Sequence, residues 1–351
     1  MAFLAALQSA IRPPLPFSSP GTSVVRLTPG GFDPRMAVDL RPIATPLSFG
    51  STEGPFADMV SHVLVPAGFV AVPQAAAPAR SSDAGDLRPG DPVGVALVTG
   101  DLSVAATGTV TLVDGPRVHA FGHAFFNLGT SRLPMTRAYV HAILPSLMSS
   151  TKVASAGDII GTILQDRVTG IAGRLGDMPG TIPLTVTLRT ERGVSQQLKL
   201  GLAEHPLLTP LFALASLLNS FGSYEREMGA ATYRVRARLA IRGRGTIEYG
   251  DVLTGDAAAT AAASTVAVPL GALLTSDIEP IQVERIEVDV DTAERPALAT
   301  IERAWLDSAD VRPGRQVPLK ILLGTWRGED LVQTVPIDIP ADPSGPLTLL
   351  V

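Results

Sequence analysis

The sequence predicts a mainly β protein, and three observations lead to this prediction. Proline and glycine are frequent, with 30 and 33 residues in a chain of 351, so turns are expected to be common. Valine, threonine and leucine recur in short runs of alternating polarity, which is typical of half-buried strands. Glycine, proline and aspartate separate these runs at the spacing of a small barrel or sandwich.

Residues 1–86 are expected to form an irregular α+β lead-in. A short strand is predicted at 41–47, a helix at 52–64 and a second short strand at 68–72, because each segment has the matching spacing of apolar residues. A linker rich in proline and alanine follows at 73–86, where the composition favours a flexible loop.

Residues 87–200 are predicted to form a β module of short strands. The strand candidates are 93–98, 103–113, 118–121, 158–164 and 181–188, whereas 135–149 fits either a helix or a strand. The second and third candidates form a hairpin with Asp114 and Gly115 at the centre of a type I′ turn. The return strand breaks at Gly122 and presents His123. An imidazole suits proton transfer near neutral pH, and the alternative is a core histidine that caps a turn.

Residues 201–225 are expected to be a connector and residues 226–351 a second β domain. The segment 205–221 is the clearest helix, because it is apolar on most sides and ends at Gly222. In the second domain we expect a strand at 232–243 and an alanine-rich helix at 257–274. Further strands are predicted at 281–290, 297–306, 316–325 and 331–339, and these are typical of an immunoglobulin-like sandwich. Residues 346–351 also fit a strand.

One predicted strand carries arginines on a single face. Residues 232–243 alternate apolar side chains with Arg234, Arg236, Arg238 and Arg242. Such a face can bind an anionic partner. The more ordinary role is a solvated face that protects a sheet edge from aggregation. The sequence leaves both roles open.

Composition excludes several classes of function. The formal net charge of −5 gives no reason to expect nucleic acid as a partner. The absence of cysteine excludes disulfides, a thiolate zinc site and a cysteine nucleophile. No apolar run is long enough to span a bilayer, and the N-terminal segment lacks the features of a signal peptide. The oligomeric state is not predicted.

No cofactor or metal is predicted. His119 and His123 are four residues apart, but they lie on a strand and turn and lack the glutamate of a zinc-binding helix. The glycine-rich run at 170–176 matches no nucleotide-binding motif and is expected to be a turn. His62, His141 and His205 stand singly among apolar residues, where packing is the ordinary role.

Three motifs in order resemble the SpoIVB-type serine peptidases, in particular the long bacterial members with a C-terminal β domain. The first motif is GTVT, DG and AFGHAFFNLG within residues 108–129. The second comprises PMTRA at 134–138 and STK at 150–152, and the third is GTILQDRVTGIAG at 161–173. The resemblance covers residues 90–190 and continues more loosely beyond them. Ala124 stands where relatives often have proline.

The resemblance implies a chymotrypsin-like double β-barrel with a Ser-His-Asp triad, in which His123 falls on the general base. It also implies a protein or peptide substrate or partner and an extracytoplasmic setting in bacteria. The family's nucleophile segment, G-M-S-G-S-P, and its upstream acidic residue are absent from this sequence. Ser103, Ser149 and Ser150 lack the glycine-flanked turn of a nucleophile.

Two functional predictions follow from this comparison. The first is a serine endopeptidase domain that begins after the nucleophile segment and is incomplete or inactive as this chain. The second is a non-catalytic, β-rich scaffold or protein-interaction module that keeps the peptidase fold.

Overall fold

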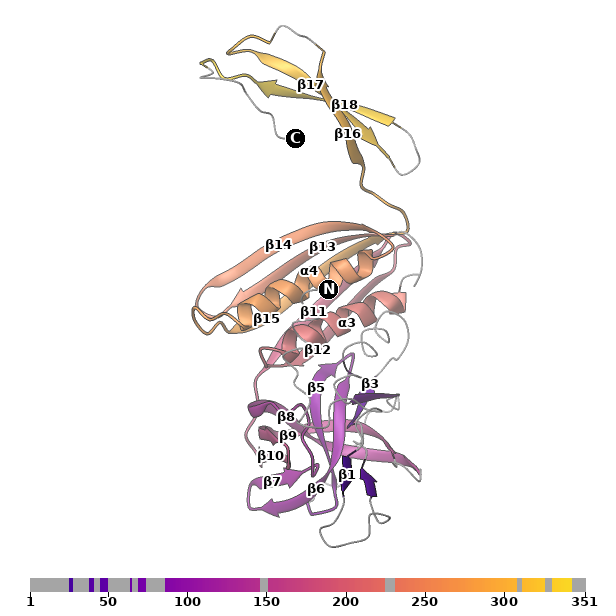
Figure 1. Ribbon diagram of the computed structural model, residues 1–351, viewed down its shortest axis with the longest axis vertical. Helices are drawn as coiled ribbons and strands as arrows, with labels where there is room; N and C mark the ends of the chain where they lie inside the picture. The colour runs from indigo at the N-terminus through magenta and orange to yellow at the C-terminus, as the bar shows by residue number, and fades with distance from the viewer. Residues whose placement is uncertain are drawn as a thin grey trace.

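The computed structural model describes residues 25–27, 38–40, 45–49, 64, 69–73, 86–145, 151–224, 231–307, 311–325 and 330–342. This part of the chain is mainly β, as predicted. A 13-stranded mixed sheet is accompanied by a two-stranded and a three-stranded antiparallel sheet (Figure 1). The expected lead-in helix, most of the linker, the strand at 346–351, His62, Ser149 and Ser150 lie outside the described residues.

Six strands of the large sheet follow one another around a partial ring. Their order is β5, β8, β9, β10, β7 and β6, and β6 pairs back onto β5. Their bounds are β5 (Pro92–Gly100), β6 (Val104–Asp114), β7 (Arg117–Ala120), β8 (Gly129–Leu144), β9 (Thr151–Arg167) and β10 (Gly170–Leu175). All neighbours in the ring are antiparallel.

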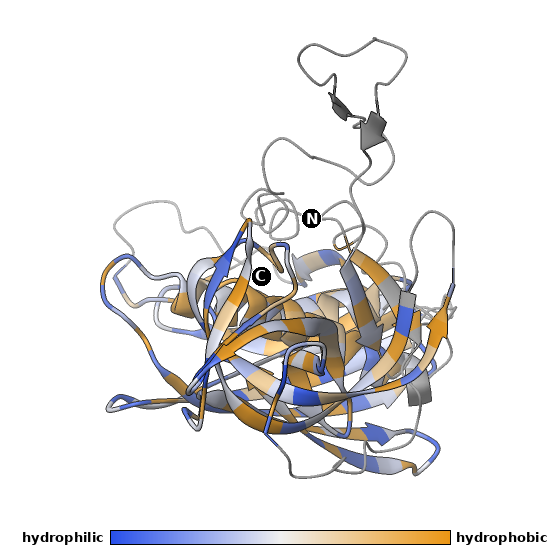
Figure 2. Cartoon of the chain, turned by 90° about the horizontal axis from the view of Figure 1, so that it is seen from below, coloured by the Kyte–Doolittle hydropathy of each residue, from blue (hydrophilic) through white to orange (hydrophobic). Residues whose placement is uncertain are grey.

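Alternation of side chains fills the ring with apolar residues. The buried positions include Val95, Val110, Val118, Met135 and Ile163, each at most 2% exposed. Figure 2 shows the same alternation as hydrophobic and hydrophilic bands along the strands. Residues 129–144 form strand β8, so the open choice for this segment is resolved in favour of a strand over its described part.

The two predicted strands of the lead-in join this ring. β3 (Thr45–Phe49) pairs antiparallel with β6, and β4 (Phe69–Pro73) pairs parallel with β3. A separate antiparallel pair is formed by β1 (Val25–Leu27) and β2 (Val38–Leu40).

The rest of the large sheet is covered by two helices on one face (Figure 1). From the ring outward the strands are β12, β11, β15, β13 and β14, and β12 pairs with β5 of the ring. Their bounds are β11 (Thr181–Thr190), β12 (Ser195–Ala203), β13 (Ala231–Ile241), β14 (Gly245–Gly255) and β15 (Val283–Ala293). The sheet therefore continues across the boundaries expected near residues 200 and 225.

The helices predicted at 205–221 and 257–274 are present and lie next to each other. They are α3 (Leu208–Tyr224) and α4 (Ala258–Leu274). Alternate residues of β13, from Tyr233 to Ile241, are buried on the face that packs against α4. This burial confirms the alternation predicted for the strand at 232–243.

Helix α3 begins with a histidine cap. The Nδ1 atom of His205 accepts the backbone N–H groups of Leu207 and Leu208 at 3.2 and 3.4 Å. The hydroxyl of Thr209 accepts the N–H of His205 and donates to Ala203, both at 2.8 Å. Burial lowers the pKa of His205 to about 4. The imidazole is therefore neutral at pH 7 and free to accept at the helix N-terminus.

The last three described strands form a small antiparallel sheet that stands apart in Figure 1. They are β16 (Thr300–Leu306), β17 (Gln316–Gly324) and β18 (Asp330–Asp338). The four segments expected to build one sandwich are thus divided, because β15 belongs to the large sheet.

Candidate functional site

The loop that carries His123 leaves β7 through two residues with left-handed backbone. Phe121 has φ of 77° and Gly122 of 75°. A left-handed conformation is costly for a phenylalanine, so the surrounding contacts must hold it. The hairpin before the loop differs from the prediction. Its central turn residues are Gly115 and Pro116, and proline cannot adopt the positive φ of a type I′ turn.

A buried carboxylate holds this loop. Asp166 lies in β9, has no exposed surface and accepts three backbone N–H groups. These come from Phe125 and Phe126, both at 2.7 Å, and from Leu128 at 3.1 Å. Hydrogen bonds to an ionised group are short and strong, so one side chain fixes four consecutive residues of the loop.

Aromatic packing holds the loop from the other side. The ring centroids of Phe125 and Phe126 lie 4.5 Å apart. Both rings pack against Phe69 of β4, with centroid distances of 5.8 Å from Phe125 and 4.4 Å from Phe126. Phe121 meets Phe125 edge to face at 5.9 Å. The backbone around His123 is therefore supported by both the carboxylate and these rings.

The imidazole of His123 is exposed at this loop, with one ring nitrogen engaged. Its Nδ1 lies 2.7 Å from the carbonyl oxygen of Ala124. Because a carbonyl oxygen only accepts, this contact is a hydrogen bond when Nδ1 carries the proton. Nε2 is then the unprotonated nitrogen and can accept a proton. Within the described residues, neither a serine nor a carboxylate hydrogen-bonds to this ring.

A serine–histidine hydrogen bond occurs elsewhere. Nε2 of His141 and the hydroxyl of Ser155 are 2.8 Å apart, on neighbouring strands β8 and β9. The residue Ser155 is only 1% exposed, and no described carboxylate bonds to His141. A substrate cannot reach this hydroxyl, so the pair is structural. The sequence does not indicate it, because His141 and Ser155 are brought together only by the pairing of β8 and β9.

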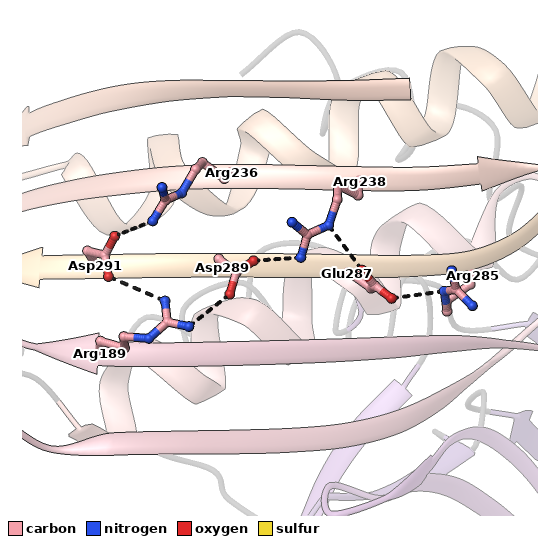
Figure 3. Close-up of polar contacts among 7 residues, drawn as sticks. All are labelled: Arg189, Arg236, Arg238, Arg285, Glu287, Asp289 and Asp291. Atoms are coloured by element: carbon pink, nitrogen blue, oxygen red, sulfur yellow. Dashed lines mark hydrogen bonds and ion pairs between the residues drawn. The ribbon is translucent and has the colours of Figure 1, made fainter. Parts of the chain in front are cut away.

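The predicted arginine face is a network of ion pairs (Figure 3). Arg236 binds Asp291 at 2.9 Å, and Arg238 binds Glu287 at 3.0 Å and Asp289 at 2.8 Å. The hydrogen bond to Glu287 and the charge of Asp289 raise the pKa of Arg238.

Further arginines bind carboxylates of β15. On the other side of β15, Arg189 of β11 binds Asp289 and Asp291 at 3.3 and 3.5 Å. Arg285 binds Glu287 at 3.0 Å, and Arg242 binds Glu284 at 2.9 Å.

This network corrects one expectation for the arginine face. Strand β13 lies between β14 and β15, so its arginines do not protect an edge. Arg236 and Arg238 form ion pairs with carboxylates of β15, whereas Arg234 has no ion pair with a described residue.

Comparisons of this chain with protein-family models, curated proteins and solved structures find no match. No helix of the described part is long and apolar enough to cross a membrane. Among the same residues, no group of three histidine, aspartate or glutamate side chains is arranged to hold a metal ion.

Proposed function

We propose that this chain is a SpoIVB-type serine peptidase domain protein in which His123 stands in the position of the general base. The support is the sequence resemblance together with one geometric observation. His123 is exposed on a firmly held loop, and its Nδ1 bonds to a carbonyl so that Nε2 is available. In this proposal the ring β5–β10 is a chymotrypsin-like barrel, and the separate sheet of β16, β17 and β18 is related to part of an immunoglobulin-like sandwich.

The proposed role of His123 is to take the proton of a serine hydroxyl and return it to the leaving amine. The carbonyl of Ala124 orients the ring, which is the task of the aspartate in a triad. Asp166 is a positioning residue, because it holds the loop without touching His123. The nucleophile motif of the family is absent from the sequence, so we propose that these 351 residues alone do not form an acyl-enzyme.

The second candidate is a non-catalytic, β-rich module that binds a protein or peptide. The observation that favours it is the lack of a serine hydrogen-bonded to His123 among the described residues. The family's extracytoplasmic setting applies to both candidates and is also a proposal.

The deciding experiment begins with the genomic sequence immediately upstream of Met1. If the reading frame continues into a G-M-S-G-S-P segment, the extended chain is treated with a fluorophosphonate probe, and the labelled residue is identified by mass spectrometry. The proposal predicts labelling of that serine and its loss in His123→Ala, with no labelling of the 351-residue chain.

Three results would contradict the peptidase proposal. An upstream frame that lacks the motif would favour the non-catalytic module. An extended chain that labels equally well with and without His123 would remove the general-base role. Labelling of Ser155 that disappears in His141→Ala would transfer that role to His141.

A further inference from the structure

A small cavity lies beside the His123 loop, on the outer face of the ring. Its volume is about 200 Å³, and Gly122, the residue before His123, is part of its lining. Cavities for drug-sized ligands and cofactors measure roughly 300–1,000 Å³. This cavity is therefore too small for a nucleotide cofactor and suits the end of a chain or a single side chain.

The hollow follows from the strand register. Ala172 of β10 lies between His119 of β7 and Gln165 of β9, which are its partners on either side. One pair further along β10, Gly170 lies opposite Arg167. Small residues on the central strand thus form a floor between longer side chains on both neighbours.

The cavity lining is basic, and in its surroundings Asp114 of β6 lies opposite Arg117 in the strand register. The cavity lining contains His119 and Arg167 and no acidic residue. The next outward-facing pair on β7 and β10 is Arg117 opposite Arg174. Like charges directly opposite each other on neighbouring strands are destabilising. None of these four basic side chains has an ion pair with a described residue, in contrast to the paired arginines of β13.

Arg167 is held in an orientation suited to binding an anion. Its Nε donates to the amide oxygen of Gln165 at 3.0 Å, which leaves the two terminal nitrogens pointing away from Gln165. Its two terminal nitrogens have no described partner. A guanidinium fork of this kind matches the two oxygens of a carboxylate.

Two exposed apolar residues flank lining residues of the cavity, next to Thr111 and Thr169. Leu112, the strand partner of His119, is 52% exposed, and Val168 is 58% exposed. Apolar side chains in these positions favour an anion that is carried on an organic stem over a free inorganic ion.

We propose that this cavity binds a carboxylate of an extended peptide, either its C-terminus or an acidic side chain, next to the His123 loop. The inference deepens the proposed function, because it assigns a substrate or partner class to the same region. Arg167 would bind the carboxylate, the arginine pair would supply positive potential, and the flanking apolar side chains would contact the residue that bears the carboxylate.

The test uses fluorescence anisotropy with the full chain and three labelled peptides of otherwise identical alanine–valine sequence. One has a free C-terminus, one is amidated, and one is amidated with an internal glutamate. We expect one or both carboxylate peptides to bind, and the neutral peptide to bind about tenfold more weakly. Comparing the dissociation constants of the two carboxylate peptides shows whether the cavity prefers a C-terminal or a side-chain carboxylate.

Three variants locate the binding. Arg167→Gln should weaken binding about tenfold. Ala172→Leu leaves all charges unchanged but places a larger side chain in the cavity, and it should also weaken binding about tenfold. Arg234→Gln removes the same charge from a distant exposed strand position and should leave the dissociation constant unchanged. Circular dichroism checks that each variant is folded.

The proposal is overturned if no peptide binds at millimolar concentration, or if the neutral peptide binds as well as the others. It is also overturned if Arg234→Gln weakens binding as much as Arg167→Gln, or if inorganic phosphate displaces the peptide at lower concentration than acetate. Binding requires no nucleophile, and repeating it with His123→Ala separates failure of this site from failure of the proposed peptidase chemistry.

Discussion

The carboxylate of Asp166 accepts the backbone N–H of Phe126 at 2.7 Å, across 40 residues of sequence. The same side chain binds Phe125 and Leu128, so one buried carboxylate joins the aromatic packing in holding the His123 loop. The contribution of Asp166 can be measured separately from any activity of His123.

Asp166→Asn is expected to lower the free energy of unfolding by about 3 kcal/mol, because the amide keeps one acceptor oxygen and places an NH2 donor against a backbone N–H donor. Urea unfolding followed by circular dichroism measures the change. Asp177→Asn is the matched control, because Asp177 forms an exposed pair with Arg132, and such pairs contribute about 1 kcal/mol or less. Equal losses in the two variants would contradict the role assigned to Asp166.

Gly170→Ala tests the close approach of β10 to the end of β7. Gly170 has φ of 144°, and an added Cβ would lie 2.9 Å from the carbonyl oxygen of Ala120. We expect a loss of about 2 kcal/mol or more. Gly193→Ala also changes a glycine of positive φ, 83°, but has open space around the added Cβ, and should lose only about 1 kcal/mol. A smaller loss for Gly170→Ala than for Gly193→Ala would show that the contact is unimportant.

The cap of α3 predicts a dependence of stability on pH. The pKa of His205 is lowered to about 4 in the folded protein, below its ordinary value of 6.5. The unfolded chain therefore binds the proton more readily between these values. This contribution to stability is complete above pH 6.5 and is lost as the pH falls towards 4, by about 3 kcal/mol in total.

His205→Asn isolates this effect, because asparagine can cap the helix but does not titrate. The difference in unfolding free energy between the wild type and the variant should change between pH 6.5 and pH 4. A difference that is constant over this range would rule out His205 as the titrating group.

The ion pairs of β15 should depend on salt. Asp289 is 18% exposed on its side chain and binds both Arg189 and Arg238. Asp289→Asn should cost about 1 kcal/mol at low ionic strength and less in 1 M NaCl, where charges are screened. Arg234→Gln removes an arginine without a described ion pair and should show no such salt dependence. Loss of stability that is unchanged by salt would indicate a packing defect instead.

The sequence predicts helices and strands that have a regular apolar pattern. It predicts less well which strands pair with one another. Strand β13 and helices α3 and α4 lie where their patterns place them, because alternation or a long apolar run determines each one locally. The carboxylates that pair with Arg236 and Arg238 lie about 50 residues away in sequence. The alternation within β13 does not indicate which strand pairs with it, so the ion pairs with β15 could not be predicted.

The candidate site is predictable only in part for the same reason. The break at Gly122 indicates that His123 is presented at a strand end, which agrees with its exposure. The role of Asp166 depends on the register of β9 against β8 and on the return of the loop. Asp166 stands between Gln165 and Arg167 at the polar end of β9, so no local pattern indicates that its side chain is buried with hydrogen-bond partners. The sequence could not identify those partners as backbone N–H groups.

The parallel pairing of β11 with β15 has a consequence for synthesis on the ribosome. Arg189 and Asp289 are 100 positions apart. At a translation rate of about 5–20 residues per second, β15 is synthesised roughly 5–20 s after β11. During this time the edge of β11, with Leu184 and Val186, has no strand partner on that side. An open apolar edge is prone to aggregation. Rare synonymous codons between residues 231 and 282 should therefore increase the insoluble fraction, although the amino-acid sequence stays the same.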